Sequence, residues 1–221
     1  ANLDGQTKNK KRVNRKGKKL QLWITDAKGY RTAGIRTVDD KPELFVRTGN
    51  KPKKYRWPLV WTGIEGDYID PVLYDEENAA LYVISNANTD KKSLQLFDLK
   101  TKTFTKVIYS HPKYDIDEAI LSQNGDEIVG VSYVNNGYYK QHYFSDDLTQ
   151  FHSRLNQVSG SQNTFLIDTA RKNSNRLFNV SDSDNSGEVF VYNQSKNEFK
   201  SLVKLRPVSY THLRAHETVL D

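Results

Sequence analysis

Short apolar runs of β type recur along the chain, and three of them end in a serine at residues 81–85, 128–132 and 177–181. Ser85 and Ser132 lie 47 residues apart, and Ser132 and Ser181 lie 49 apart. A cadence of this length is typical of a repeat architecture in which each repeat forms one supersecondary unit.

Each of these runs stands in the same context. An apolar segment and a polar turn precede it, and a polar loop and an alternating hairpin follow it, at residues 94–108, 142–151 and 189–202. β-Branched and aromatic residues fill the runs, and no segment has a sustained helical period. Each repeat therefore predicts four short antiparallel strands.

An earlier unit repeats the pattern less regularly. Candidate strands at residues 20–26, 30–35, 43–47 and 55–61 are separated by polar segments, with a turn at Lys28 and Gly29. The chain therefore holds about four such units. Helices are expected to be nearly absent before the last dozen residues.

These units predict an all-β fold, a partial β-propeller of about four four-stranded antiparallel blades. The irregular first unit favours an open arc of a larger ring over a closed four-bladed ring. The predicted blades cover residues 20–62, 71–109, 119–155 and 165–204.

Composition narrows the class of protein. Hydrophobic residues make up 36% of the 221 residues and charged residues 27%, and no apolar run approaches about 18 residues. The chain therefore reads as neither membrane-spanning nor disordered. Without cysteine, it offers no disulfide, thiol nucleophile or cysteine-based zinc site.

The net charge of +6 is local. Eight of the 33 Lys and Arg residues lie within residues 8–19, which hold no acid, so the remaining 25 face 27 Asp and Glu residues. The run lacks interleaved aromatics for base stacking. We interpret residues 1–19 as a loop-like basic segment or truncated blade, with nucleic-acid binding as the alternative.

Several segments between residues 20 and 207 resemble, in order and spacing, the propeller of the prolyl oligopeptidase family of serine peptidases. The acylaminoacyl-peptidase and dipeptidyl-aminopeptidase-like bacterial members are the most similar. The matching segments are residues 71–98, with the strands 81–86 and 94–98, then 111–117, 130–133, 180–184 and 205–207.

In that family, the propeller precedes an α/β-hydrolase domain with a Ser-Asp-His triad and restricts which peptides reach it. The resemblance therefore implies a fragment that stops before the catalytic domain. Its partners would be the C-terminal α/β-hydrolase domain and the peptide substrates of the parent enzyme, with neither nucleic acid nor membrane. It also implies an exported enzyme, periplasmic or secreted.

The sequence motifs also predict that this chain does not carry the catalytic residues of such a hydrolase. A hydrolase of this type needs a Gly-x-Ser-x-Gly elbow to present its nucleophile, and the sequence contains no such string. The nearest segment, residues 159–162, lacks the second glycine and is expected to be a loop between blades. We expect no catalytic, cofactor-binding or metal-binding residues and no hydrolase activity in this chain.

Two other functions are compatible with the sequence. A stand-alone propeller scaffold that binds a protein partner would have the same strand pattern. A nucleic-acid binder would depend on the basic residues 8–19.

The last residues interrupt the repeat pattern. Residues 208–218 match, in order, the translation of a transposon-end sequencing adapter, so we interpret residues 208–221 as an artefactual tail. His212 and His216 have the spacing of helical metal ligands, but they fall within this tail. The origin of Pro207 stays open.

Other polar residues have structural interpretations. His111, His142 and His152 are isolated and are expected on strand or loop surfaces. Asp115 and Asp117 are expected in a connection between blades, where they accept backbone N–H groups. Trp23, Trp57 and Trp61 are expected to pack between blades.

Residues 182–187 partly imitate a calcium-binding loop. The twelfth position of that pattern is Asn193, where the loop needs a bidentate glutamate. We therefore expect a tight turn between strands in which Asp and Asn side chains bond their own backbone.

Overall fold

The computed structural model describes residues 20–26, 29–48, 56–122, 124–161, 163–170, 175–182, 185–193 and 195–204. These residues form four antiparallel sheets, and every sheet uses strands that follow one another in the chain. The all-β prediction is confirmed. Residues 1–19 and 208–221, to which the sequence assigns a basic segment and an artefactual tail, lie outside the described residues.

Fifteen strands and one helix make up the described fold. The first sheet holds β1 (Leu22–Thr25), β2 (Arg31–Val38), β3 (Lys41–Val46) and β4 (Leu59–Thr62). The second holds β5 (Ile69–Asp75), β6 (Ala80–Ser85), β7 (Ser93–Asp98) and β8 (Thr103–Tyr109). The third holds β9 (Ile116–Leu121), β10 (Ile128–Asn135) and β11 (Tyr138–Tyr143). The helix α1 (Asp146–Ser159) precedes the fourth sheet of β12 (Thr164–Thr169), β13 (Arg176–Asp182), β14 (Asn185–Asn193) and β15 (Glu198–Lys204).

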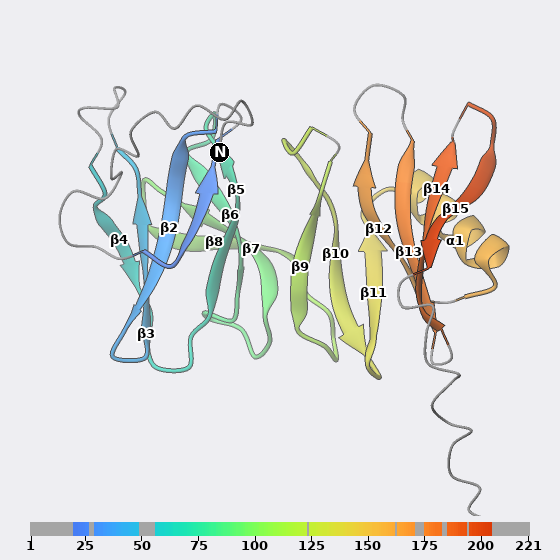
Figure 1. The fold of residues 1–221 in the computed structure, drawn as a ribbon. Coiled ribbons are helices and arrows are strands. Elements are labelled where there is room, and N and C mark those ends of the chain that lie inside the picture. The colour runs from blue at the N-terminus through green and yellow to red at the C-terminus, as the bar shows by residue number, and fades with distance from the viewer. Residues whose placement is uncertain are drawn as a thin grey trace, which may run out of the picture.

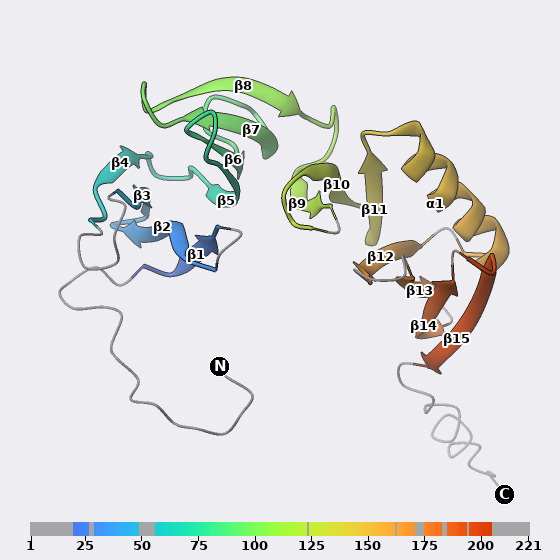
Figure 2. The same cartoon turned by 90° about the horizontal axis from the view of Figure 1, so that it is seen from above.

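The four sheets stand side by side in chain order (Figure 1). Seen from above, they follow an open arc, with β1, β5 and β12 toward its concave side (Figure 2). The strands β4, β8 and β15 lie toward the convex side, and so does α1 (Figure 2).

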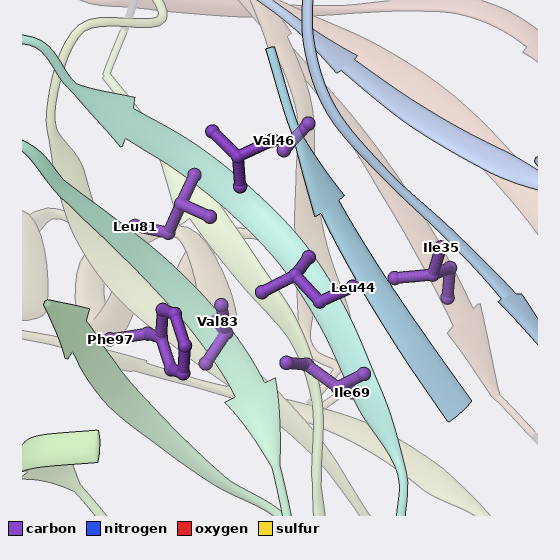
Figure 3. Close-up of a cluster of buried hydrophobic side chains, with 8 residues drawn as sticks. Ile35, Leu44, Val46, Ile69, Leu81, Val83 and Phe97 are labelled. Carbon is purple, nitrogen blue, oxygen red and sulfur yellow. The ribbon is translucent and has the colours of Figure 1, made fainter. Parts of the chain in front are cut away.

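Apolar side chains fill the joint between the first and second sheets. Ala33, Ile35, Leu44 and Val46 form one cluster with four residues of the second sheet (Figure 3). Removing these side chains from water favours the packed pair of sheets over two separate ones. The four residues of the second sheet are Ile69, Leu81, Val83 and Phe97.

The tryptophans divide between two roles. Trp61 of β4 meets Phe104 of β8 edge to face, with ring centroids 5.4 Å apart, so its predicted packing between neighbouring sheets is confirmed. Trp23 and Trp57 instead meet each other at 4.8 Å. Both belong to the first sheet region, and their packing against a neighbouring sheet stays a prediction.

A second apolar cluster joins the second and third sheets. Ile84 and Leu94 of the second sheet pack with Ile116 and Val131 of the third, and all four are buried. Neighbouring sheets therefore bury each other's faces, because the apolar face of a sheet must be covered by another element.

The helix α1 corrects the predicted strand at Phe151. Ser145 caps its first turn by accepting a hydrogen bond from the backbone N–H of Leu148, and Gly160 ends it in the left-handed conformation. Asp146 and Asp147 lie in the first turn, where the helix dipole favours negative charge. Within the described residues, the third sheet therefore has three strands, with a helix where the fourth was expected.

The inward face of α1 explains why the segment is helical. Leu148, Phe151 and Leu155 are spaced by three and four residues, so they lie on one side of a helix. Leu155 is buried in a cluster with Phe178 and Tyr192, and Phe151 packs against it. The helix thus covers a face of the fourth sheet.

A helix that spans a membrane needs a long apolar stretch, and the described part of the chain contains none.

Truncation of Leu81 tests the joint between the first two sheets. Leu81 is fully buried, so Leu81→Ala should lower the free energy of unfolding by about 2–5 kcal/mol through lost burial and a residual cavity. Urea denaturation followed by circular dichroism measures this loss. Leu202, at 53% exposure, gives the matched control, and an equal loss in Leu202→Ala would contradict the assignment.

Substitution at Gly160 tests the helix end. Its φ is +69°, and a Cβ added there would meet nothing within 4 Å, so only backbone strain opposes a side chain. Gly160→Ala should therefore destabilise the protein by about 1 kcal/mol, whereas Gly160→Asn should cost less because Asn tolerates this conformation. Thermal unfolding of the wild type and the two variants measures the order of their stabilities. Equal stability of the two variants would argue against a left-handed helix end.

Candidate functional site

A cavity of about 630 Å³ lies between the third and fourth sheets. Strands β9, β10 and β11 supply one wall, and β12 supplies the other. Cavities of this size accommodate small organic ligands. The apolar part of its lining includes Ile120, Leu121, Phe165, Leu166 and Ile167.

A row of polar side chains crosses the wall formed by the third sheet. Ser132 on β10 pairs directly with Glu118 on β9 and with Gln141 on β11, and all three line the cavity. Residues that pair directly across antiparallel strands place their side chains on the same face. The row therefore brings a carboxylate, a hydroxyl and an amide to one surface.

Gln141 ties the two walls together. Its Oε1 accepts a hydrogen bond from the backbone N–H of Leu166 at 3.1 Å and another from the Tyr143 hydroxyl at 2.9 Å. Leu166 belongs to β12, so this amide fixes the fourth sheet against the third at the cavity.

Ser132 has no equivalent contact. Its side-chain oxygen is buried and has no hydrogen-bond partner among the described residues, and the residue is only 6% exposed. A buried hydroxyl without a partner is destabilising by about 1–3 kcal/mol, so such groups are rare in folded proteins. The cavity wall thus contains an unfilled hydrogen-bonding position.

Acidic residues gather where β5 and β9 begin. Burial raises the pKa of Asp70, and the negative charge of Glu118 raises it further. Burial also raises the pKa of Tyr68, with added effects of the Asp70 and Asp117 charges. The Lys92 ammonium lies 4.5 Å from the centre of the Tyr68 ring. Carboxylates at the starts of β5 and β9 therefore share one neighbourhood.

Two of the predicted histidines are where the sequence places them. His111 lies in the connection between β8 and β9, where its Nδ1 accepts hydrogen bonds from the backbone N–H groups of Lys113 and Tyr114, both at 3.1 Å. His142 is an exposed residue of β11. Its ring stacks on that of Tyr109, with ring centroids 4.6 Å apart.

The predicted position of His152 on a strand or loop surface is wrong, because the residue lies on α1. Its Nε2–H donates to the backbone carbonyl of Thr164 at 2.7 Å, and its ring meets Tyr143 edge to face at 5.4 Å. Burial lowers the pKa of His152, the Thr164 hydrogen bond opposes that shift, and the positive charge of Lys140 adds to it. The neutral imidazole therefore fastens α1 to the fourth sheet.

The two aspartates differ from each other. Asp115 lies in a connection and its Oδ1 accepts a hydrogen bond from the backbone N–H of Lys92 at 2.8 Å, as predicted. Asp117 lies within β9, so its predicted place in a connection is wrong. The strand begins earlier than expected because Ile116 is a fully buried member of the apolar cluster.

The predicted tight turn in the calcium-like segment falls on residues outside the described ones. Asp182 ends β13, Asn185 begins β14, and the two residues pair, while residues 183 and 184 lie outside the described residues. Ser159 and Gly160 form the end of α1, and Gln162 lies outside the described residues. Over the described ranges, no three His, Asp or Glu side chains gather in a group that could hold a metal ion.

The cavity residues Glu118, Ser132 and Gln141 are ones that sequence reasoning missed. One signal was available, because Ser132 is the middle member of the three repeated serines. The spacing marks the repeat but does not show which serine lacks a partner.

Protonation of His152 should weaken the attachment of α1. Because the folded pKa lies below the ordinary value of 6.5, the unfolded chain binds the proton more readily. Stability is therefore full above about pH 6.5 and falls as the pH drops through the folded pKa. Urea denaturation across this range should show a weaker pH dependence in His152→Gln. His142→Gln is the matched control, and identical profiles for wild type and His152→Gln would contradict this role.

No family model matches the chain, and no curated protein matches it. We therefore infer function from the residues and from their arrangement in the fold.

Proposed function

We propose that this chain is the non-catalytic propeller portion of a serine peptidase similar to the prolyl oligopeptidase family. The sheets would shield the active site of an α/β-hydrolase domain and admit only short peptides. The observation that carries the proposal is the arrangement of four antiparallel sheets side by side in an arc, each built from consecutive strands (Figure 2).

Propeller architecture supplies the physical link to substrate selection. Sheets placed radially around an axis leave a narrow central opening, because the inner strands stand next to one another. An extended short peptide fits such an opening and a folded protein does not. In the described structure, β1, β5 and β12 lie on the concave side of the arc, where the opening would be (Figure 2).

The side chains support a non-catalytic role. The sequence holds no Gly-x-Ser-x-Gly elbow. The Thr164 hydroxyl lies 3.2 Å from Nε2 of His152, but that nitrogen already bonds the Thr164 carbonyl, and the hydroxyl donates to Asn156. This imidazole is therefore placed to fasten α1 and not to activate a nucleophile.

The test uses the complete reading frame that contains this sequence. We expect it to encode an α/β-hydrolase domain after the propeller, and its product to cleave a peptidyl anilide but not a folded protein. A serine-directed inhibitor should abolish the cleavage, and the present chain alone should show none. A frame without such a domain, or turnover by the chain alone that the inhibitor blocks, would refute the proposal.

A further inference from the structure

The three repeated serines do not share one register, because Ser85 pairs with Ile69 at the start of β5 whereas Ser132 pairs with Glu118 inside β9. Each lies on the second strand of its sheet, namely β6, β10 or β13. The Ser85 hydroxyl donates to the Tyr68 carbonyl at 2.6 Å, and the Ser181 hydroxyl accepts from the Asn163 amide at 2.7 Å. Both partners lie just before the first strand of the same sheet. Ser132 Oγ has no partner among the described residues.

The serine that has no hydrogen-bond partner is the one that lies at the cavity. Ser132 lines the space between the third and fourth sheets, whereas Ser85 and Ser181 are not among its lining residues. A buried hydroxyl that no described residue satisfies, and that lines a cavity, points to an external partner there. A hydroxyl can accept a hydrogen bond or donate one, so the surrounding charges decide which ligand fits.

Those charges are negative. Glu118 pairs directly with Ser132 across the strands, and Asp168 lines the opposite wall. Within the described part of the chain, no Lys or Arg side chain belongs to the lining. The apolar residues of β9 and β12 supply the remainder of the surface, so the site favours a cation with an apolar body.

We propose that this cavity binds a small organic cation, a protonated primary amine attached to an apolar group. Glu118 pairs with the ammonium, and Ser132 accepts one of its N–H bonds. Directly paired residues on neighbouring strands have Cβ atoms about 5 Å apart, so one ammonium with three donors reaches both. The apolar group contacts Phe165 and Ile167 on the fourth sheet. The site does not depend on the proposed function.

The first experiment compares three probes of one shape with the full chain: phenethylamine, 2-phenylethanol and 3-phenylpropanoate. Isothermal titration should give phenethylamine a Kd of about 1 mM, as expected for a ligand of its size. The neutral and anionic probes should bind at least about tenfold more weakly, because they lack the ammonium. Ring resonances of Tyr139 and Phe165 should shift with phenethylamine. Equal binding of the three probes, or no binding, would overturn the proposal.

Variants assign the contacts. Glu118 is exposed, so Glu118→Gln should fold normally and weaken phenethylamine binding about fivefold or more. Ser132→Ala should weaken it about threefold to tenfold. Ile167, at 50% exposure, can be changed to Trp to fill the cavity, which should remove binding of every probe.

Glu65→Gln is the matched control, because Glu65 is an exposed acid outside the cavity lining, and it should leave binding unchanged. Circular dichroism checks that each variant is folded. Binding that survives both Glu118→Gln and Ser132→Ala would show that these two residues do not hold the amine. An equal loss of binding in Glu65→Gln would show that general surface charge holds it. Either result would overturn the proposal.

Discussion

Burial of one sheet face against the next is the interaction on which this structure depends. Each sheet has three or four short strands, and a single sheet cannot enclose a core because its apolar face needs a second layer. Leu44 and Leu81 become fully buried only because the first and second sheets meet, and Ile84 and Val131 do so where the second meets the third. The arc is therefore a chain of shared interfaces.

The third and fourth sheets are held together in a different way. A hydrogen-bonded glutamine and a helix connect the sheets there, and a cavity takes the place of a continuous apolar cluster. The helix contributes Leu155 and Phe151 to the core of the fourth sheet. The wall of this cavity carries the polar row of Glu118, Ser132 and Gln141.

Much of the fold could be predicted from sequence, because alternating apolar residues and turn signals act locally. The serines Ser85, Ser132 and Ser181 marked the second strand of three sheets correctly. The helix was missed because Phe151 alone resembles a strand residue, while its helical partners Leu148 and Leu155 are separated by polar residues. The cavity could not be predicted, since it depends on how closely two sheets approach and no local pattern records that distance.

The strictly sequential strand order has a consequence for how the molecule opens. Since each strand pairs with its immediate neighbours in sequence, every sheet can form or dissolve without disturbing the pairing of another. Amide hydrogen exchange would then follow a nearest-neighbour hierarchy, with the central sheets slowest and the terminal ones released as separate cooperative units. A single unfolding midpoint would average over these steps, as it does in linear repeat arrays.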